Sequence, residues 1–512
     1  MSLAVVASRA LDGLAAPEVR VEVHLANGLP SFTLVGLADT EVKEARERVR
    51  AALAESGFAF PHNKRITVNL APADLPKESG RFDLPIALGI LAAQGLLDLQ
   101  RLKGVEFAGE LSLAGELRPV RGALALALAA REATPRPTLV LPVASAAEAA
   151  RVEGLDIRAA RHLSDVVQAL QPAGEGEGPR WDLPRAEAEA DVRVPASIDL
   201  RDVKGQAAAK RALEIAAAGG HSVLLVGPPG TGKSMLAQRL AGLLPPMSDD
   251  EALSTAALHS ISVRGFEPAQ WRVRPVRHPH HSASAVALVG GGSPPRPGEI
   301  SLAHGGVLFL DELPEFPRAA LEALREPLET GQITISRAAR QAQYPARFQL
   351  VAAMNPCPCG WLGAFAATGK NCRCSPEAVA RYQGKLSGPL LDRIDMQVEV
   401  PAITPAALMG AADGEPSAEV AERVALARQR QLQRQAAPNS EVAVGELDAV
   451  CRLEPAAAQF MQAVAGRLGW SGRSLHRVMK LSRTIADLAG ADEVNVAAVA
   501  EAVQYRRALP ES

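Results

Sequence analysis

Apolar and polar positions change their spacing along the chain, and the changes divide it into three parts. In the first part, VRVEVHLA (19–26) and ITVNLA (66–71) alternate or run apolar, as strands with a buried face do. The stretches at 41–57 and 82–97 carry apolar residues at helical spacing. We therefore predict a mixed α/β domain over residues 1–171.

A segment rich in Gly, Pro and charged residues, 172–197, interrupts this pattern and predicts an exposed linker. Beyond it, HSVLLVG, VLFLDE and FQLVAAMN indicate buried strands, and helical spacing appears at 203–220 and 316–329. Alternating strands and helices are typical of a parallel sheet covered by helices, which predicts an α/β core over 198–403. Residues 404–512 are rich in Ala and have no strand signal, which predicts a helical lid.

Composition narrows the classes of function. The 512 residues hold 55 Lys and Arg against 57 Asp and Glu, so no global positive field attracts nucleic acid and any such contact needs a local basic surface. The N-terminal apolar run is broken by Arg9 and Asp12, unlike a signal peptide or a spanning helix, which predicts a cytoplasmic protein without membrane contact. In that compartment clustered cysteines indicate metal or redox chemistry.

The clearest chemical motif is GPPGTGKS at 227–234, which fits G-x-x-x-x-G-K-[ST] between a predicted strand and a predicted helix. Backbone N–H groups of such a loop face phosphates, Lys233 neutralises the β and γ oxygens, and the Ser234 hydroxyl binds Mg²⁺. The predicted nucleotide-binding residues of this motif are Gly227, Pro228, Pro229, Gly230, Thr231, Gly232, Lys233, Ser234 and Met235.

A second element of a nucleotide site is VLFLDE at 307–312, a predicted buried strand that ends in two carboxylates. Asp311 is expected to hold Mg²⁺ through water, and Glu312 to polarise the attacking water. The alternative is a strand followed by a solvated acidic turn. The phosphate-binding motif upstream favours the catalytic interpretation.

Together these two motifs resemble those of the AAA+ ATPases, and the resemblance implies further roles. Asn355 corresponds to the sensor that orients the attacking water, and Gln206 lies where the family contacts the base. Arg393 corresponds to the arginine finger, which reaches a neighbouring subunit, and Arg473 to the second sensor. A finger acting on a neighbour implies a ring, with a homohexamer as the expectation. The alternative for each arginine is an ordinary surface or interface residue.

Two insertions distinguish the chain from a minimal AAA+ core. The segment 273–306 contains His278, His280 and His281, which suggests either a metal site or, as Pro279 favours, a packed loop. The segment 333–348 alternates as a hairpin does and is expected to turn near 340–342. Its three arginines either meet DNA phosphates or form salt bridges on a solvated hairpin, and these residues are Arg337, Arg340 and Arg347.

The insertions, with RPVRHPHHSAS, GEISLAHGGVLFLDELPEF and RSLHRVMKLSRTIADL, resemble the magnesium-chelatase-like AAA+ proteins of the ComM/YifB family. The segments PSFTLVGLADTEVKEARERVRAAL and ITVNLAPADLPKESGRFDLPIALGIL resemble that family's opening domain, which is similar in fold to the Lon-protease/ribosomal-S5 type. The resemblance implies an ATP-driven hexameric DNA motor for branch migration in natural transformation. Its partners would be single-stranded and branched DNA and recombination proteins.

Other activities remain open at this point. One alternative is the motor subunit of a metal chelatase, and another is an ATP-dependent protease or remodelling factor without DNA activity. A Lon-type protease needs a Ser-Lys dyad. However, Arg81 and Phe82 occupy the neighbourhood of the expected serine, and LRPVRGALALALAA lacks the lysine. We therefore predict a non-catalytic N-terminal domain, although Ser79 and Lys77 are close in sequence.

Four of the five cysteines stand between residues 355 and 376 as two C-x-C pairs, namely Cys357, Cys359, Cys372 and Cys374. Four thiolates suffice for a closed, structural zinc site, which is the favoured interpretation. An iron–sulfur cluster, a redox pair and four unligated thiols are the alternatives. The segment joins Asn355 to Arg393, so we expect loss of these cysteines to impair assembly or turnover before nucleotide binding.

Overall fold

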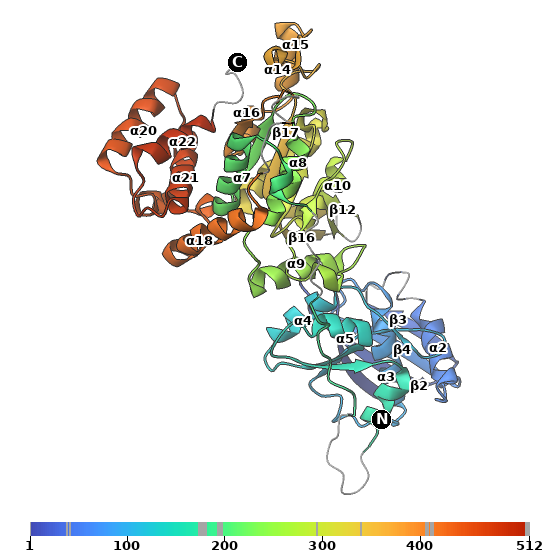
Figure 1. Ribbon diagram of the computed structural model, residues 1–512. Helices are drawn as coiled ribbons and strands as arrows, with labels where there is room; N and C mark the ends of the chain where they lie inside the picture. Colours follow the sequence, from blue (N-terminus) through green and yellow to red (C-terminus); the bar gives the residue numbers. More distant parts are fainter. Residues whose placement is uncertain are drawn as a thin grey trace. The chain divides into compact units, whose positions relative to one another are not determined.

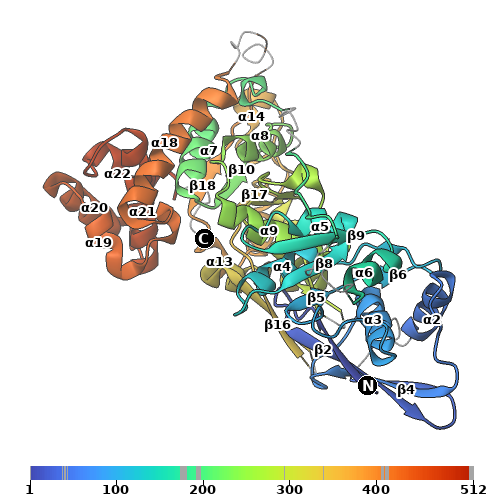
Figure 2. The same ribbon diagram turned by 90° about the horizontal axis from the view of Figure 1, so that it is seen from below.

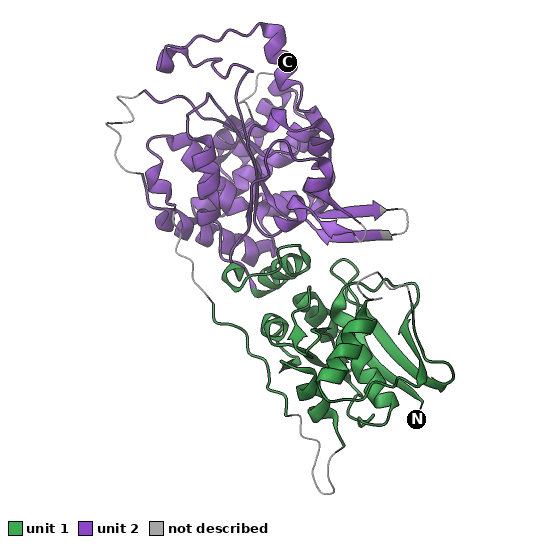
Figure 3. Cartoon of the chain, turned by 90° about the vertical axis from the view of Figure 1, so that its right-hand side faces the viewer, with its two compact units in different colours: residues 1–193, 249–271 green, residues 194–248, 272–512 purple. Residues whose placement is uncertain are grey.

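The computed structural model describes residues 2–36, 39, 42, 44–172, 182–191, 198–292, 295–337, 340–404, 409 and 414–506, without the side chains of residues 337 and 340. The chain divides into two compact units (Figure 3). Unit 1 comprises residues 1–193 and 249–271, and unit 2 comprises residues 194–248 and 272–512. Mixed α/β architecture with parallel sheets and a C-terminal helical region confirms the fold class expected from the sequence.

Unit 1 is built on a seven-stranded mixed sheet in the order β3-β4-β2-β1-β5-β8-β9. The pairs β1/β2 and β2/β4 are antiparallel, whereas β5, β8 and β9 run parallel. Apolar positions alternate inward along β2 because successive side chains of a strand point to opposite faces. The strands of this unit are β1 (Leu3–Arg9), β2 (Glu18–Asn27), β3 (Ser31–Val35), β4 (Lys64–Ala71), β5 (Val105–Phe107), β6 (Glu110–Leu111), β7 (Leu117–Arg118), β8 (Thr138–Pro142) and β9 (Asp156–Ala160).

The central helix of unit 1, α3, is buried at every residue, which agrees with its nearly uninterrupted apolar sequence. It packs on β1 and β2, where Val23 approaches Gly89 so closely that a Cβ on the glycine would lie 2.5 Å from the valine side chain. The helices of this unit are α2 (Ala45–Glu55), α3 (Asp83–Ala93), α4 (Ala123–Arg131), α5 (Val143–Ala149), α6 (Leu163–Leu170) and α9 (Asp249–Ile261).

Helix α9 comes from the middle of the predicted ATPase core but packs in unit 1. Leu253, Ala256 and Ala257 are buried in one cluster with the apolar residues of α4 and α5. Past the helix, the Arg151 guanidinium lies over the Trp271 ring at 4.7 Å, and Gly122 N–H donates to the Ser260 carbonyl at 3.1 Å. Residues 249–271 therefore belong to unit 1 and not to the predicted ATPase core. The remaining domain boundaries stay predictions.

The middle of the predicted linker is held against unit 1. Residues 173–181 and 192–197 lie outside the described part of the chain. Between them, Ala186 N–H donates to the Ile157 carbonyl at 2.8 Å, and Ala159 N–H donates to the Pro184 carbonyl at 2.9 Å. Leu183 is buried in the core of the unit. Apart from the buried Leu183 and the partly buried Ala186, residues 182–191 are exposed, so these hydrogen bonds hold an exposed stretch along the edge of β9.

Unit 2 contains a five-stranded parallel sheet in the order β11-β14-β17-β10-β18. Its three central strands are buried throughout, as the near-continuous apolar runs predicted. The strands of this unit are β10 (Val223–Val226), β11 (Val276–Arg277), β12 (Gly290–Gly291), β13 (Arg296–Pro297), β14 (Val307–Leu310), β15 (Gln332–Arg337), β16 (Arg340–Pro345), β17 (Gln349–Met354) and β18 (Met396–Glu399).

Helices of unit 2 cover this sheet and form the C-terminal region, which gathers beside α7 (Figure 1 and Figure 2). The single helix expected over 316–329 is two short helices, because Pro327 has no N–H to continue the hydrogen-bond ladder. The helices of this unit are α7 (Ala207–Gly219), α8 (Lys233–Leu240), α10 (Ala285–Val289), α11 (Glu299–Leu302), α12 (Arg318–Glu322), α13 (Arg325–Thr330), α14 (Phe365–Thr368), α15 (Pro376–Gln383), α16 (Gly388–Leu391), α18 (Ser417–Gln435), α19 (Leu447–Val450), α20 (Pro455–Leu468), α21 (Gly472–Leu488) and α22 (Val496–Gln504).

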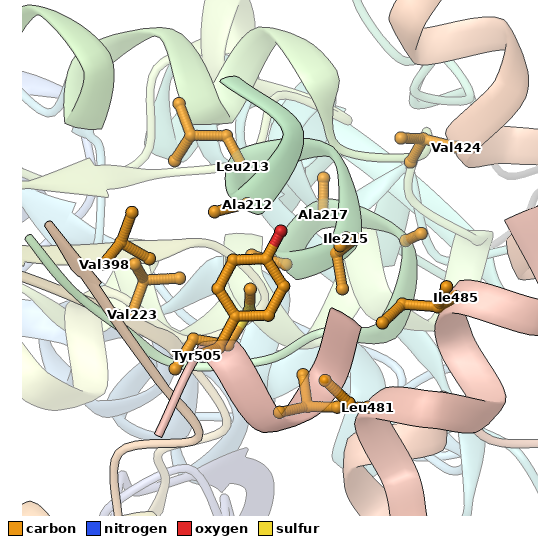
Figure 4. Packing of buried hydrophobic residues seen from close by; sticks show 14 of the residues in the cluster. Ala212, Leu213, Ile215, Ala217, Val223, Val398, Val424, Leu481, Ile485 and Tyr505 are labelled. Atoms are coloured by element: carbon orange, nitrogen blue, oxygen red, sulfur yellow. The ribbon is translucent and has the colours of Figure 1, made fainter. Parts of the chain in front are cut away.

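One apolar core joins the sheet of unit 2 to the C-terminal helices. Figure 4 shows Tyr505, just past α22, beside Val223 and Val398 of the sheet. The Tyr505 carbonyl accepts a hydrogen bond from Gln397 N–H at 2.7 Å, and Arg477 of α21 pairs with Asp395 just before β18. The start of α21 is thereby held near the turn that precedes β18.

Strands β15 and β16 form the predicted hairpin, which protrudes from unit 2 (Figure 3). Its register pairs Arg337 with Arg340, so residues 340–342 belong to β16 and do not form the turn expected there. Residues 338–339 themselves lie outside the described part. The period-two pattern continues on both sides of the turn, which explains why it did not locate the turn.

Candidate functional site

Lys233 opens α8 directly after the phosphate loop (residues 227–232), at the carboxyl end of β10. Its Nζ donates to the carbonyls of Gly227 at 2.8 Å and Pro228 at 2.9 Å, and to Asn355 Oδ1 at 3.2 Å. Asn355 follows β17, the neighbour of β10 in the sheet. The parallel sheet thus brings the predicted lysine and the predicted sensor together.

Ser234 and Asp311 form the second contact of this site. Ser234 Oγ donates to Asp311 Oδ2 at 2.6 Å, and the other Asp311 oxygen accepts from Glu312 N–H at 2.9 Å. Asp311 follows β14, which pairs with the other edge of β17. A hydroxyl beside a carboxylate is the oxygen donor set that Mg²⁺ takes in phosphoryl-transfer sites, so these two residues fit that ion.

Burial shapes the electrostatics around Lys233. Burial lowers the pKa of Lys233, while the carboxylates of Asp311 and Glu312 raise it. Lys233 as a whole residue is 8% exposed, so its ammonium group is poorly hydrated, which strengthens its attraction to a phosphate anion. The loop is suited to bind a polyphosphate rather than a neutral ligand.

His281 touches the predicted catalytic carboxylate, a contact that the sequence did not reveal. His281 Nδ1 lies 3.1 Å from Glu312 Oε2, and Glu312 takes a left-handed backbone conformation with φ of 53°. His278 packs on the Phe309 ring at 4.5 Å, and the rings of His280 and His281 lie 4.1 Å apart. Among the described residues no group of three or more metal-ligating side chains includes these histidines, and His278 and His280 are exposed.

Gln206 ties the phosphate loop to the sheet. Its Nε2 donates to the Thr231 carbonyl at 3.2 Å and to the Pro401 carbonyl at 2.8 Å. Its predicted contact with a base stays a prediction. Met235, in the first turn of α8, leaves 42% of its surface exposed.

The predicted finger and second sensor meet at one carboxylate. Arg393 and Arg473 both pair with Glu329 Oε1, the latter at 3.4 Å. Within the described ranges, no hydrogen bond or ion pair joins either arginine to Lys233 or Asp311. The structure therefore groups these two arginines with each other and not with the phosphate loop of their own chain.

The hairpin arginines occupy two different places. Arg337 and Arg340 face each other across the backbone ladder at the turn, and their side chains lie outside the description. Arg347 lies at the base of the hairpin, where its Nη1 is 3.4 Å from Glu441 Oε2. For Arg347 the structure gives the salt bridge that was the alternative to a DNA contact.

The four clustered cysteines have the geometry of a metal site. Their Sγ atoms all lie within 4.8 Å of one another, and three of the separations are 3.4, 3.6 and 3.7 Å. Four sulfurs at about 2.3 Å from a tetrahedral zinc are about 3.8 Å apart, so the cluster fits a closed thiolate site. Backbone N–H groups of Arg373 and Trp361 lower the pKa of Cys359 to about 6, which favours the thiolate that binds metals.

The loop that carries these cysteines, residues 355–376 (the cysteine loop), presses on the phosphate loop. A Cβ added at Gly360 would lie 2.7 Å from both Cδ and Cγ of Pro229. On the other side, Gln383 of α15 donates to the Pro356 carbonyl at 2.9 Å. Lys370 Nζ lies 4.1 Å from the centre of the Trp361 ring, which it covers. The cysteine loop thus braces the nucleotide site directly, which the sequence did not indicate.

Comparison with known proteins places this arrangement in a family. Family models described as magnesium chelatase, subunit ChlI, match residues 199–408, and those for subunit ChlI of Mg-chelatase and for its C-terminal part match 21–145 and 414–506. Competence protein ComM of Haemophilus influenzae is 50% identical over 99% of this chain and 98% of its own length. The uncharacterized YifB proteins of Salmonella typhimurium and Escherichia coli are each 48% identical over 99% of this chain and 97% of theirs.

The chain belongs to the ComM/YifB family of magnesium-chelatase-like AAA+ proteins. Membership of this AAA+ family indicates ATPase activity, with ATP and Mg²⁺ as the cofactors. Within the described ranges, no helix combines the length and apolar composition that a membrane crossing requires.

In this family member the expected protease position of unit 1 is occupied by a buried arginine. Arg81 Nε donates to Ser79 Oγ at 3.1 Å, and its Nη2 donates to the Arg121 carbonyl at 3.1 Å. Lys77 Nζ donates to the Pro72 carbonyl instead of to Ser79. A serine nucleophile needs a base that accepts its proton, and Ser79 instead accepts from a guanidinium. In the described part of the chain, Ser79 is thus paired with Arg81 and not with Lys77, and the non-catalytic role of the domain stays a prediction.

Sequence reasoning missed three contacts in this ComM/YifB-type site: His281 with Glu312, Glu329 with the two arginines, and Gly360 with Pro229. The histidine run in 273–306 was a usable signal for the first. The other two join segments that are distant in sequence, and neither glutamate nor glycine stood out in its own segment.

Proposed function

We propose that this chain is an ATP-driven, homohexameric DNA motor that promotes branch migration during natural transformation in the cytoplasm. The observation that carries the proposal is the joining of Lys233 to Asn355 and of Ser234 to Asp311 at one edge of the sheet. The name of the competence protein that is 50% identical over nearly the whole chain supports the biological setting.

The residues of the site suit a nucleotide with its Mg²⁺. Lys233 and the N–H groups of the phosphate loop would bind the phosphate oxygens, and Ser234 and Asp311 would hold Mg²⁺, which neutralises charge between the β and γ phosphates. Glu312 would take the proton of the attacking water, and Asn355 would orient that water. Gln206 and Met235 would contact the rest of the nucleotide.

The arginines support a ring. Arg393 and Arg473 pair with Glu329, and in the described part of the chain neither bonds to Lys233 or Asp311, so a second copy of the chain is the natural place for their phosphate. A site completed by a neighbour closes most simply in cyclic symmetry. We propose a homohexamer in which each nucleotide is hydrolysed at the boundary of two subunits.

DNA would bind through the hairpin β15–β16. Arg337 and Arg340 flank its turn, and such contacts with phosphates give binding that depends on salt and not on sequence. Single-stranded and branched DNA are the proposed substrates, and recombination proteins the proposed partners. Arg347 would contribute only if its pair with Glu441 opened.

We also propose that the four cysteines hold a structural Zn²⁺. The sulfur separations and the four-thiolate donor set support zinc over ions that prefer oxygen ligands. Four protein ligands leave no position for a reacting water, so the ion would brace the cysteine loop against the phosphate loop.

A branch-migration assay comparing the wild type with Lys233→Ala tests the proposal. We expect the wild type to move three-strand or four-strand junctions in the presence of ATP and Mg²⁺, and Lys233→Ala to lose that movement. The exposed lysine in Lys204→Ala is the matched control and should leave the rate unchanged. Junction movement that persists without Lys233 contradicts an ATP-driven motor.

The descriptions of the matching family models favour one second candidate, the motor subunit of a metal chelatase. In that case single-stranded or forked DNA would leave the ATPase rate unchanged. Only chelatase partner subunits with a porphyrin would stimulate it. Stimulation by DNA in the same ATPase assay decides against this candidate.

A further inference from the structure

Glu329 lies near the end of α13 and shares one oxygen between two arginines from distant parts of unit 2. Arg393 precedes β18, and its Nη2 pairs with Glu329 Oε1. Arg473 lies in the first turn of α21, and its Nη2 is 3.4 Å from the same oxygen. The Arg393 side chain is 7% exposed, whereas that of Arg473 is 64% exposed.

The Glu329 carboxylate compensates the charge of the buried Arg393 guanidinium. Among the described residues this guanidinium also contacts the Pro389 carbonyl, 2.6 Å from Nη1, and its buried Nε has no partner there. The hydrogen bond with Arg393 is the main cause that lowers the pKa of Glu329. A buried guanidinium that loses its only carboxylate must find another anion or reach water.

Positive charge is in excess around this carboxylate. Arg325, one turn before Glu329 on α13, also lowers the pKa of Glu329 and pairs with Glu322 at 2.7 Å. Three arginines therefore face two glutamates. Guanidinium groups bind phosphate oxygens with the same donors that bind a carboxylate, so a phosphate brought to this edge competes directly with Glu329 for Arg393.

The two residues that follow Glu329 are hydrogen-bonded to the hairpin. The next residue, Thr330, donates its hydroxyl to the carbonyl of Gln332, the first residue of β15, at 3.0 Å. Gly331 closes the base of the hairpin, since its carbonyl accepts from Ala346 N–H at 2.8 Å. A displacement of the hairpin base therefore moves the backbone that carries the Glu329 carboxylate.

We propose that Glu329 is a positioning residue that couples the hairpin to the arginines: it holds Arg393 and Arg473 within their own subunit, and a DNA-driven shift of the hairpin base releases Arg393 to the phosphate of the neighbouring subunit. The inference rests on the proposed function, because it needs both a neighbour's nucleotide and DNA at the hairpin. In this proposal the Glu329 carboxylate alone couples DNA binding at the hairpin to the release of Arg393.

The test is the ATPase rate of Glu329→Gln with and without single-stranded DNA. The change removes the charge but keeps the shape, so we expect the rate without DNA to rise by about tenfold, the equivalent of one charge-assisted hydrogen bond. DNA should then stimulate the variant less than twofold. Glu326→Gln, which removes a charge from the exposed face of the same helix, is the matched control and should behave as the wild type.

Several outcomes overturn the proposal. A rate for Glu329→Gln that falls in equal proportion with and without DNA would mean that the carboxylate only supports the fold, and an unchanged DNA stimulation would mean that it carries no signal. Glu329→Asp keeps the charge but shortens the side chain by one methylene, which weakens the contact with Arg393. It should therefore raise the ATPase rate without DNA by a smaller factor than Glu329→Gln does. This variant decides the matter if Glu329→Gln does not fold, and a rate at or below the wild-type value overturns the coupling.

Failure of the proposed function has a different signature. A wild type whose ATPase ignores DNA contradicts the DNA motor, and the coupling falls with it. A wild type that DNA stimulates, and that loses turnover in Arg393→Ala while still binding nucleotide, supports the motor. In that background a Glu329→Gln protein that keeps full DNA stimulation contradicts the coupling alone.

Discussion

Replacing Gly360 by alanine should damage the nucleotide site from outside the phosphate loop. Gly360 has φ of 83°, and a Cβ there would lie 2.7 Å from two atoms of the Pro229 ring. Gly363, in the same loop, has φ of 75°, and a Cβ there would meet nothing within 4 Å. Both substitutions impose a left-handed alanine, but only the first pushes on the phosphate loop.

The cost of the left-handed backbone and the cost of the clash with Pro229 can each be estimated. A left-handed alanine costs about 1–2 kcal/mol, which both variants lose in stability. Overpacking against a ring that belongs to the backbone adds about 1–3 kcal/mol, and only Gly360→Ala carries it. If relief of this clash moves Pro229 and the loop behind it, roughly 1.4 kcal/mol lost in nucleotide binding corresponds to about tenfold weaker affinity.

The assay is titration of each purified variant with a fluorescent ATP analogue, together with urea unfolding and metal content. We expect Gly363→Ala to bind nucleotide as the wild type does, and Gly360→Ala to bind about tenfold more weakly with the same metal content. Equal affinities for the two variants would refute the idea that the cysteine loop braces the phosphate loop through this contact.

Three further predictions concern the metal, the catalytic carboxylate and unit 1. Cys357→Ser should lower the metal from about one zinc per chain to almost none and lower turnover before it affects nucleotide binding, and full zinc retention by elemental analysis would contradict the four-thiolate site. His281→Ala should lower kcat about tenfold without changing nucleotide affinity, because Glu312 loses its contact with the imidazole. The control His280→Ala should lower kcat less than threefold. Equal effects of the two substitutions in the ATPase assay would show that the contact of His281 with Glu312 does not matter for turnover. Leu253→Ala should destabilise unit 1 by about 2–5 kcal/mol in urea unfolding, and a loss below about 0.5 kcal/mol would show that α9 does not belong to its core.

The sequence predicted that the residues of the candidate nucleotide site come together, because their positions follow from sheet geometry. Lys233, Asp311 and Asn355 each stand just after a buried strand, and parallel strands end at one edge. The spacing of a motif carries this information without knowledge of the rest of the chain. Contacts across the fold, such as that of Glu329 with Arg473, carry no such periodic signal and required the structure.

Predictions about which surfaces meet were weaker for a related reason. The apolar residues of α9 predict a buried face but do not specify the partner, so its place in unit 1 was missed. Likewise, composition at 172–197 predicted an exposed linker but did not show that Leu183 is buried and that the backbone of Pro184 and Ala186 bonds to β9. Pro327, by contrast, was visible in the sequence and could have split the helix expected over 316–329.

The insertion of residues 249–271 into unit 1 also affects when each unit can fold during synthesis. The first 193 residues leave the ribosome without the helix that covers the apolar residues of α4, which must stay exposed while the phosphate loop and α8 are made. Domains generally fold as units from the N-terminus during translation. Here the earlier unit closes its core only after residues 194–248 of the later unit have been made, so the start of the later unit is synthesised before the earlier unit is complete.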